Sequence, residues 1–166
     1  MKIKKRYIII AFLLLVIGGG YLYKKMNNNL QIQCNAADKK IEIYQVKDNT
    51  KQSIEECWTA IDTDTLYTFN VGDVISLSFP KKPDIIEIRE ILLNPSTKTS
   101  LYRKVSDQQI LYTIDQNCVK YSIPDNIATR LSSNPPEVDM RAYIVKLRIN
   151  HREVLYTFLI KTNSIL

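Results

Sequence analysis

The chain has 166 residues, and its 23 Lys and Arg against 17 Asp and Glu give a net charge of +6. Six of the basic residues and none of the acidic ones fall within residues 1–25, so the rest of the chain carries 17 charges of each sign. A nucleic-acid-binding surface needs basic residues in excess on one face. The charge balance therefore argues against nucleic acid as a partner, and the length allows one ordinary domain after residue 25.

An almost unbroken apolar segment runs from Tyr7 to Tyr23. At 17 residues it would form roughly 25 Å of helix, against a hydrocarbon core of about 30 Å. Four basic residues precede the segment and two follow it, so the positive-inside rule places the N-terminus in the cytoplasm and the remaining chain outside. Residues 1–25 are therefore predicted to be a signal-anchor helix that crosses the cell membrane once through residues 7–23.

The same segment is open to a second interpretation, as a signal peptide that is cleaved. Its most apolar part, Ile8 to Ile17, has the length of a signal-peptide core, and the small residues Gly18 and Gly20 would suit cleavage before Tyr21. An Ala-x-Ala cleavage site is absent there. We favour the anchor, whereas cleavage would make the protein a secreted one.

A linker is predicted over residues 26–38, which are polar and show no sustained period. The extracytoplasmic domain is expected to occupy residues 39–166. Its first strand is predicted between Lys39 and Val46, where Ile41 and Ile43 alternate with polar residues.

The next segment, Ser53 to Ile61, fits two structures. Ile54, Cys57, Trp58 and Ile61 would share a helical face, with Ser53 and Glu56 at the spacing of a capping box. Cys57, Thr59 and Ile61 would equally share one face of a strand. The aromatic and β-branched residues favour the strand.

Six further segments are predicted to be strands because short runs of apolar and β-branched residues are separated by turn residues. They are Leu66 to Phe69, Val74 to Phe79, Ile85 to Ile91, Ser100 to Val105, Gln109 to Ile114 and Cys118 to Pro124. A polar, proline-broken connection with room for one helical turn follows at residues 125–139.

The end of the chain has the clearest pattern. Tyr143, Val145, Leu147 and Ile149 share one face, and Val154, Tyr156, Phe158 and Ile160 share the next, with "NHRE" between them. This pattern predicts a β-hairpin. Short strands at intervals of about ten residues, without a convincing amphipathic helix, predict an all-β antiparallel sandwich.

The segment "DMRAYIVKL" places Asp139 four residues before Tyr143. It resembles the tyrosine-corner segment of immunoglobulin-like (Ig-like) domains, in which the tyrosine hydroxyl bonds nearby backbone. The layout from about Glu56 to Thr162 resembles small Ig-like proteins exported by Gram-positive bacteria, through "FNVGDVISLSF", "PDIIEI", "YIVKL" and "LYTFLIKT". Val145 stands where antibody domains often carry a cysteine. The resemblance implies an Ig-like β-sandwich and almost nothing about activity.

Three cysteines, Cys34, Cys57 and Cys118, would lie in a compartment that permits disulfides. Their odd number leaves at least one unpaired or paired between chains. Cys57 with Cys118 is the favoured disulfide because both fall in strand-like segments, and three reduced thiols are the alternative. With one histidine and no Cys-x-x-Cys, we expect neither a metal site nor a cofactor.

Candidates for catalysis are sparse. His151 falls in the predicted hairpin turn, where a general base would lack a partner and a pocket. Asp62 and Asp64 could hold a cation weakly, but they are expected to form a turn that bonds its own backbone. A glycine-rich phosphate loop is absent. We assign no catalytic residue and expect that the protein is not an enzyme.

Ten tyrosines are compatible with sandwich packing and also with a recognition surface. The leading hypothesis is a membrane-anchored module that acts non-catalytically through contacts with an unidentified envelope or membrane protein. The alternative is an extracytoplasmic protein that binds a small ligand in a pocket lined by tyrosines. Long loops commonly carry binding, so residues 92–105 and 126–139 are the predicted functional loops.

Overall fold

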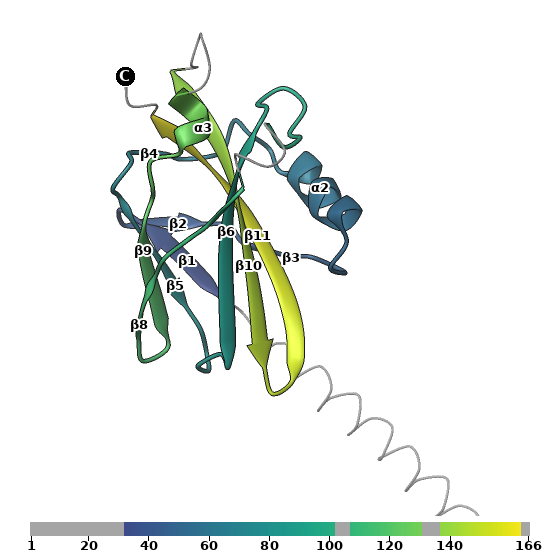
Figure 1. The fold of residues 1–166 in the computed structure, drawn as a ribbon, viewed down its shortest axis with the longest axis vertical. Helices are drawn as coiled ribbons and strands as arrows, with labels where there is room; N and C mark the ends of the chain where they lie inside the picture. The colour runs from purple at the N-terminus through teal and green to yellow at the C-terminus, as the bar shows by residue number, and fades with distance from the viewer. Residues whose placement is uncertain (1–31, 102–106, 131–136, 164–166) are drawn as a thin grey trace, which may run out of the picture. The chain divides into compact units, whose positions relative to one another are not determined.

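A computed structural model of the chain describes residues 32–101, 107–130 and 137–163 (Figure 1). The predicted anchor over residues 1–25 lies outside these ranges. Among the helices that the described ranges contain, none combines the length and the apolar character needed to span a bilayer.

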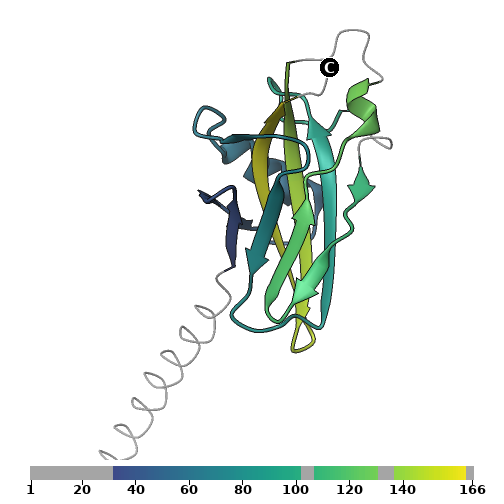
Figure 2. The ribbon, with the colours of Figure 1, turned by 90° about the vertical axis from the view of Figure 1, so that its left-hand side faces the viewer.

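Two sheets make up most of the described chain (Figures 1 and 2). In the first sheet, the strand order is β2 (Lys39–Ile41), β1 (Gln33–Ala36), β5 (Val74–Ser78), β9 (Cys118–Ser122) and β8 (Thr113–Asp115). All of its neighbouring strands are antiparallel.

The second sheet is built around the long hairpin. Its order is β3 (Tyr44–Gln45), β11 (Arg152–Asn163), β10 (Val138–Ile149), β6 (Ile85–Leu93) and β7 (Gln108–Gln109), and β4 (Thr68–Phe69) also pairs with β11. The β4–β11 pair is parallel and the others are antiparallel. The chain thus has the all-β, two-sheet architecture predicted from its pattern.

The predicted hairpin is confirmed. Asn150 and His151 form a two-residue turn, both with positive φ (51° and 63°), and Ile149 pairs with Arg152 to close it. This geometry matches the right-handed twist of the flanking strands. The hairpin therefore sets the register of the second sheet.

A core fills the space between the two sheets, and the predicted alternations supply it. From the first sheet come Ile75, Leu77, Phe79, Val119, Tyr121 and Ile123, and from the hairpin come Tyr143, Val145, Leu147, Tyr156, Phe158 and Ile160. Residues between these positions face outward because side chains alternate along a strand. Val154, predicted to share this face, is half-buried against the core.

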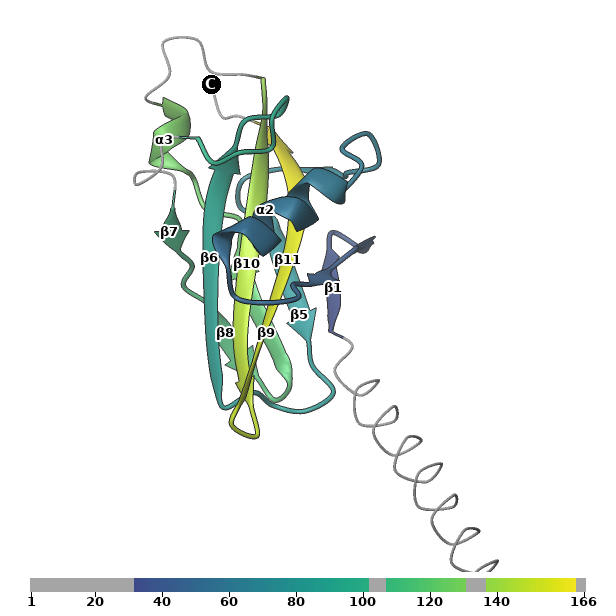
Figure 3. The same cartoon turned by 90° about the vertical axis from the view of Figure 1, so that its right-hand side faces the viewer.

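The strand predicted at Ser53 to Ile61 is wrong, because this segment forms α2 (Lys51–Ala60). Thr50 caps the helix by accepting a hydrogen bond from the Ser53 N–H at 3.2 Å. The helix lies across the outer face of the second sheet (Figure 3). Its apolar side includes Trp58, which packs with Ile61 and Leu159 in a second, smaller core. Tertiary packing of this face selects the helical period, although the aromatic and β-branched residues favour the strand.

The prediction that residues 26–38 form a linker is wrong for its last part. Strand β1 lies there, with Cys34 and Ala36 buried and Asn35 half-buried between them. It pairs with β2 on one side and β5 on the other. The sequence pattern did not indicate this strand, because its polar residues occupy the outer face.

Smaller differences concern the middle of the chain. The strand predicted from Leu66 is reduced to Thr68–Phe69. Of the strand predicted over residues 100–105, the structure describes Ser100 and Leu101, and Ser100 forms a single bridge with Leu93. The rest of this predicted strand lies outside the described ranges. The helical turn predicted in the long connection is confirmed as α3 (Ile127–Arg130).

Candidate functional site

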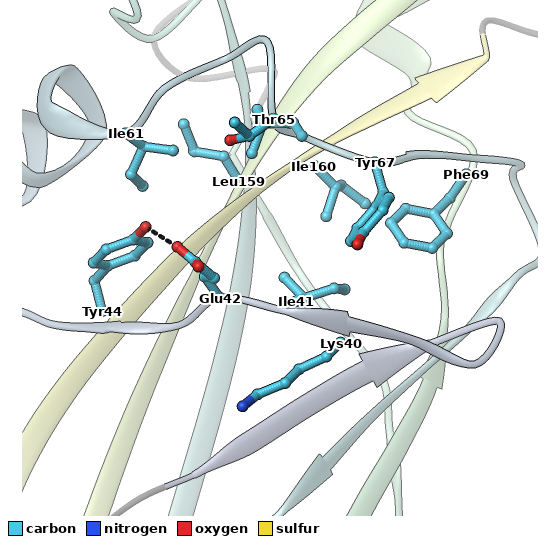
Figure 4. A pocket seen from close by; sticks show the side chains of 11 residues that line it. Lys40, Ile41, Glu42, Tyr44, Ile61, Thr65, Tyr67, Phe69, Leu159 and Ile160 are labelled. Carbon is cyan, nitrogen blue, oxygen red and sulfur yellow. Dashed lines mark hydrogen bonds between the residues drawn. The ribbon is translucent and has the colours of Figure 1, made fainter.

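A pocket of about 210 Å³ opens at the edge of the second sheet (Figure 4). It is lined by Lys40, Ile41, Glu42, Tyr44, Ile61, Thr65, Leu66, Tyr67, Phe69, Leu159 and Ile160. One wall is the segment from β2 to β3, and the other is the segment from the end of α2 to β4. Strand β11 passes between them. We call this hollow the β11 pocket.

The floor of the β11 pocket is a stretch of strand edge that its neighbours leave unpaired, where Leu159 is 2% exposed. Pairing with β3 stops at Thr157, and pairing with β4 resumes at Lys161. The Val46 N–H donates to the Leu155 carbonyl at 2.8 Å, and the Lys161 N–H donates to the Tyr67 carbonyl at 3.1 Å.

The odd-numbered residues of β11 therefore direct their backbone groups toward this edge, because backbone directions alternate along a strand. Leu159 is the odd-numbered residue in the gap between the two pairings. Its N–H and C=O consequently point into the opening, and no described residue pairs with it on that side.

The rim is aromatic and charged. The Tyr44 hydroxyl donates to Glu42 Oε2 at 2.5 Å, and this hydrogen bond, with burial and the Glu42 charge, raises the pKa of Tyr44 to about 12. The Lys39 ammonium lies 5.0 Å from the centre of the Tyr67 ring and 5.6 Å from that of Phe69, within the range of cation–π attraction. Tyr44 is thus a hydrogen-bond donor at neutral pH, not a base.

The wall next to α2 is fixed by polar contacts. The Asp64 N–H donates to Asp62 Oδ1 at 3.0 Å, and the Thr65 hydroxyl donates to the Asp62 carbonyl at 2.9 Å, which confirms the predicted turn. Lys98 Nζ donates to the carbonyls of Thr59 (2.9 Å) and Ile61 (2.5 Å). A cation at the C-terminal end of α2 is favourable to the helix dipole and holds Ile61 in the pocket wall.

A separate polar cluster is buried at β6 and β10. The Glu90 carboxylate, completely buried, accepts hydrogen bonds from the Tyr143 hydroxyl (2.5 Å), Asn126 Nδ2 (2.9 Å), Gln108 Nε2 (3.0 Å) and an Arg141 guanidinium nitrogen (3.2 Å). We call it the Glu90 cluster. A buried carboxylate is tolerated when its lone pairs are satisfied in this way.

Arg141 extends the cluster toward α3. Its guanidinium donates to the Pro124 carbonyl at 2.5 Å and lies 3.6 Å from Asp139 Oδ2. That carboxylate also accepts from the Thr129 hydroxyl at 2.9 Å. The cluster therefore ties α3 and the segment after β9 to the second sheet. Most of its buried groups are paired with one another, and Arg141 Nε is buried without a hydrogen-bond partner.

The tyrosine-corner prediction is wrong about the partner of Tyr143. Strand β10 begins at Val138, so Tyr143 lies well inside the strand, and its hydroxyl meets Glu90 from the neighbouring strand. Asp139, the other corner residue, is buried beside Arg141. Both predicted residues thus belong to the Glu90 cluster and not to the pocket.

The disulfide predicted between Cys57 and Cys118 is not formed in the structure. All three cysteines are free thiols. Cys57 lies on α2, which packs on the outer face of the second sheet, whereas Cys118 begins β9 of the first sheet. The reason for the pairing, that both cysteines fall in strand-like segments, does not hold for Cys57, which lies on a helix.

A wider hollow of about 710 Å³ lies along the segment from β7 to β8 and strand β9. It is shallow, and its border exposes Leu111 (91% exposed) and Val74. The β11 pocket is smaller but better enclosed, and it combines apolar, aromatic and unpaired backbone groups.

Sequence reasoning did not find the β11 pocket. Of the predicted functional loops, residues 92–105 and 126–139, none of the residues that the structure describes lines it. Tyr44 and Tyr67 fall in predicted strands, and both are exposed on its rim (36% and 46%). His151 is exposed in its turn. The described residues contain no group of three or more His, Cys, Asp or Glu side chains arranged to hold a metal ion.

The Glu90 cluster had a signal in the sequence. In the predicted strand Ile85 to Ile91, Glu90 lies on the same face as Ile86 and Ile88. In the hairpin, Arg141 lies on the same face as Tyr143. Two opposite charges on the buried faces of two strands indicate an internal ion pair, because a buried charge requires a partner.

Searches with the whole chain found no family model, no curated protein and no solved structure that matches it.

Proposed function

We propose that this protein is a membrane-anchored, extracytoplasmic Ig-like module that acts without catalysis, through contact with another protein of the membrane or envelope. The observation that carries the proposal is the β11 pocket, a hollow that offers apolar side chains, aromatic rims and an unpaired stretch of strand edge. These are the groups through which proteins bind one another.

Strand order supports the Ig-like part of the proposal. In Ig-like domains one sheet has strands A, B, E and D, and the other has G, F and C. With β1, β5, β6, β8, β9, β10 and β11 as A to G, the two sheets read A-B-E-D and G-F-C. The segment with β2, β3, α2 and β4 is then an insertion between A and B, and this insertion supplies most of the pocket.

The size of the pocket favours a protein partner over a free small molecule. Sites for small molecules commonly measure about 300 to 1,000 Å³, whereas the β11 pocket measures about 210 Å³. A hollow of this size suits a side chain projecting from a larger partner. The groups that could support acid–base chemistry, Glu90 and Asp139, are buried and engaged with their neighbours.

Photo-crosslinking in intact cells tests the proposal. The full chain is made with p-benzoylphenylalanine in place of Tyr67 on the pocket rim, and in a control in place of Ile114, which has almost the same exposure (46% and 44%). We expect a discrete crosslinked product from position 67 and none from position 114. Absence of a discrete product at position 67, or equal products at both positions, would contradict a specific contact there.

A small-ligand-binding function is the second candidate, and the two tyrosines at the pocket favour it. It predicts that a low-molecular-weight compound raises the melting temperature of the purified protein. A thermal-shift screen, repeated with Thr65→Trp to obstruct the pocket, separates the two functions. A ligand whose effect disappears in this variant would support the second candidate.

A further inference from the structure

The backbone at Leu159 restricts what the β11 pocket can bind. A residue with both its N–H and its C=O directed out of a sheet edge is complemented by the backbone of another extended chain, as in β-strand addition. The gap between Thr157 and Lys161 is bounded by β3 and β4. It therefore has room for a short extended segment and not for a long added strand.

The side chains around Leu159 define what such a segment must carry. Ile61, Leu66, Phe69 and Ile160 supply apolar surface, so the residue that pairs with Leu159 can bury one aliphatic or aromatic side chain. Tyr44 and Tyr67 stand at the rim, where rigid aromatic rings commonly flank an anchoring residue.

Charge at the rim adds a second requirement. Lys39 is exposed beside the pocket, and no ion pair joins it to another described residue. Lys40 follows it in β2, and its side chain points away from the apolar lining (Figure 4). Glu42 is engaged by the Tyr44 hydroxyl. Beside Tyr67 and Phe69, on the rim away from Glu42, the charge offered to a ligand is therefore the Lys39 ammonium, and it complements an acidic group next to the apolar residue.

We propose that the β11 pocket binds a short extended peptide segment of a partner protein, with one apolar residue in the pocket, two backbone hydrogen bonds to Leu159 and an acidic residue facing Lys39. This inference rests on the proposed function and names the chemistry of the partner.

Selection of peptides tests the inference. The full chain, biotinylated and held in detergent micelles, is panned against a phage library of random short peptides, and enriched sequences are synthesised for affinity measurement. We expect them to share an apolar residue with Asp or Glu nearby. Thr65→Trp, which obstructs the pocket, should weaken binding at least tenfold. Thr68→Trp, an exposed threonine of the same segment outside the pocket, should not.

The role of the backbone is tested on the peptide, independently of any variant's folding. N-methylation of the apolar residue removes its hydrogen-bond donor and should weaken binding by about threefold to tenfold. Failure to enrich any peptide, equal binding to Thr65→Trp, or indifference to N-methylation would overturn the inference. Self-association of the full chain that Thr65→Trp abolishes would also overturn it, in favour of a second copy.

Failure of the inference remains distinguishable from failure of the proposed function. If crosslinking at position 67 gives a discrete product while no peptide binds the pocket, the contact function holds and the peptide assignment falls. If crosslinking at position 67 gives no discrete product and no peptide binds the pocket, both the contact function and the peptide assignment are contradicted.

Discussion

At the scale of single residues, two buried tyrosines with different environments make a matched pair. The rings of Tyr121 and Tyr143 have centres 5.6 Å apart. Tyr143 donates to Glu90, whereas the Tyr121 hydroxyl is buried without a hydrogen-bond partner. A hydrogen bond to a charged group contributes about 1.5–3 kcal/mol, and an unsatisfied buried hydroxyl costs about 1–3 kcal/mol.

The same substitution should therefore have opposite effects at the two positions. We expect Tyr143→Phe to lower the free energy of unfolding by about 1.5–3 kcal/mol and Tyr121→Phe to raise it by about 1 kcal/mol. Urea denaturation of both variants measures the difference. Equal losses in the two variants would show that the Tyr121 hydroxyl is satisfied in solution.

Both tyrosines also make stability depend on pH. Burial, followed by the charges of neighbouring groups, raises the pKa of each well above the usual 10. The folded state then keeps protons that the unfolded state releases. Stability is accordingly full below about pH 10 and falls above it, by up to about 1.4 kcal/mol per pH unit for each tyrosine.

Denaturation at several pH values between about 9 and 11 measures this slope. The double variant Tyr121→Phe, Tyr143→Phe should have a shallower slope than the wild-type protein. Tyr44, Tyr156, Cys34 and Cys57, whose pKa values are also raised, remain in it and account for a residual slope. An unchanged slope would contradict the burial of the two core tyrosines.

At the scale of elements, α2 is held to the second sheet by one buried hydrogen bond. The indole N–H of Trp58 donates to the Thr157 hydroxyl at 2.7 Å, and that hydroxyl donates to the Tyr143 carbonyl at 2.9 Å. Trp58 is the single tryptophan of the chain, so its fluorescence reports on the docking of this helix alone.

Thr157→Val keeps the shape of the side chain and removes the acceptor, which leaves the indole N–H buried and unpaired. We expect a loss of about 1–3 kcal/mol in the free energy of unfolding, together with a red-shifted Trp58 emission and stronger acrylamide quenching. Thr113→Val, on an exposed position of β8, is the control and should change neither. Unchanged quenching in Thr157→Val would mean that apolar packing alone docks the helix.

The elements differ in how far the sequence could predict them, for physical reasons. The hairpin was predictable because each strand buries one face along its whole length, so its period is unambiguous. Strand β1 buries only Cys34 and Ala36 between polar neighbours. The α2 segment fits both periods, and Thr50, which caps the helix, precedes the segment Ser53 to Ile61. The β11 pocket depends on where β3 and β4 stop pairing, which no local pattern encodes.

At the scale of the whole molecule, labelling of the three cysteines can test the fold and the proposed export of the domain together. Cys34 is fully buried between the sheets, and burial raises the pKa of its thiol well above the ordinary value. Cys57 and Cys118 are half-buried free thiols. Since only the thiolate of an accessible cysteine reacts readily, Cys34 should be protected while the fold is intact.

A membrane-impermeant maleimide added to intact cells exploits this difference. If the domain is displayed outside the membrane, Cys57 and Cys118 react in intact cells, and Cys34 reacts only after denaturation. Cys57→Ser and Cys118→Ser should each remove one label, as mass measurement of the labelled chain would show. Labelling of the two thiols only after lysis would contradict export, and a requirement for prior reduction would reveal a disulfide. Early reaction of Cys34 would contradict the packing of β1 in the core. The labelling of Cys57 and Cys118 therefore tests export and disulfide formation, and the labelling of Cys34 tests the fold.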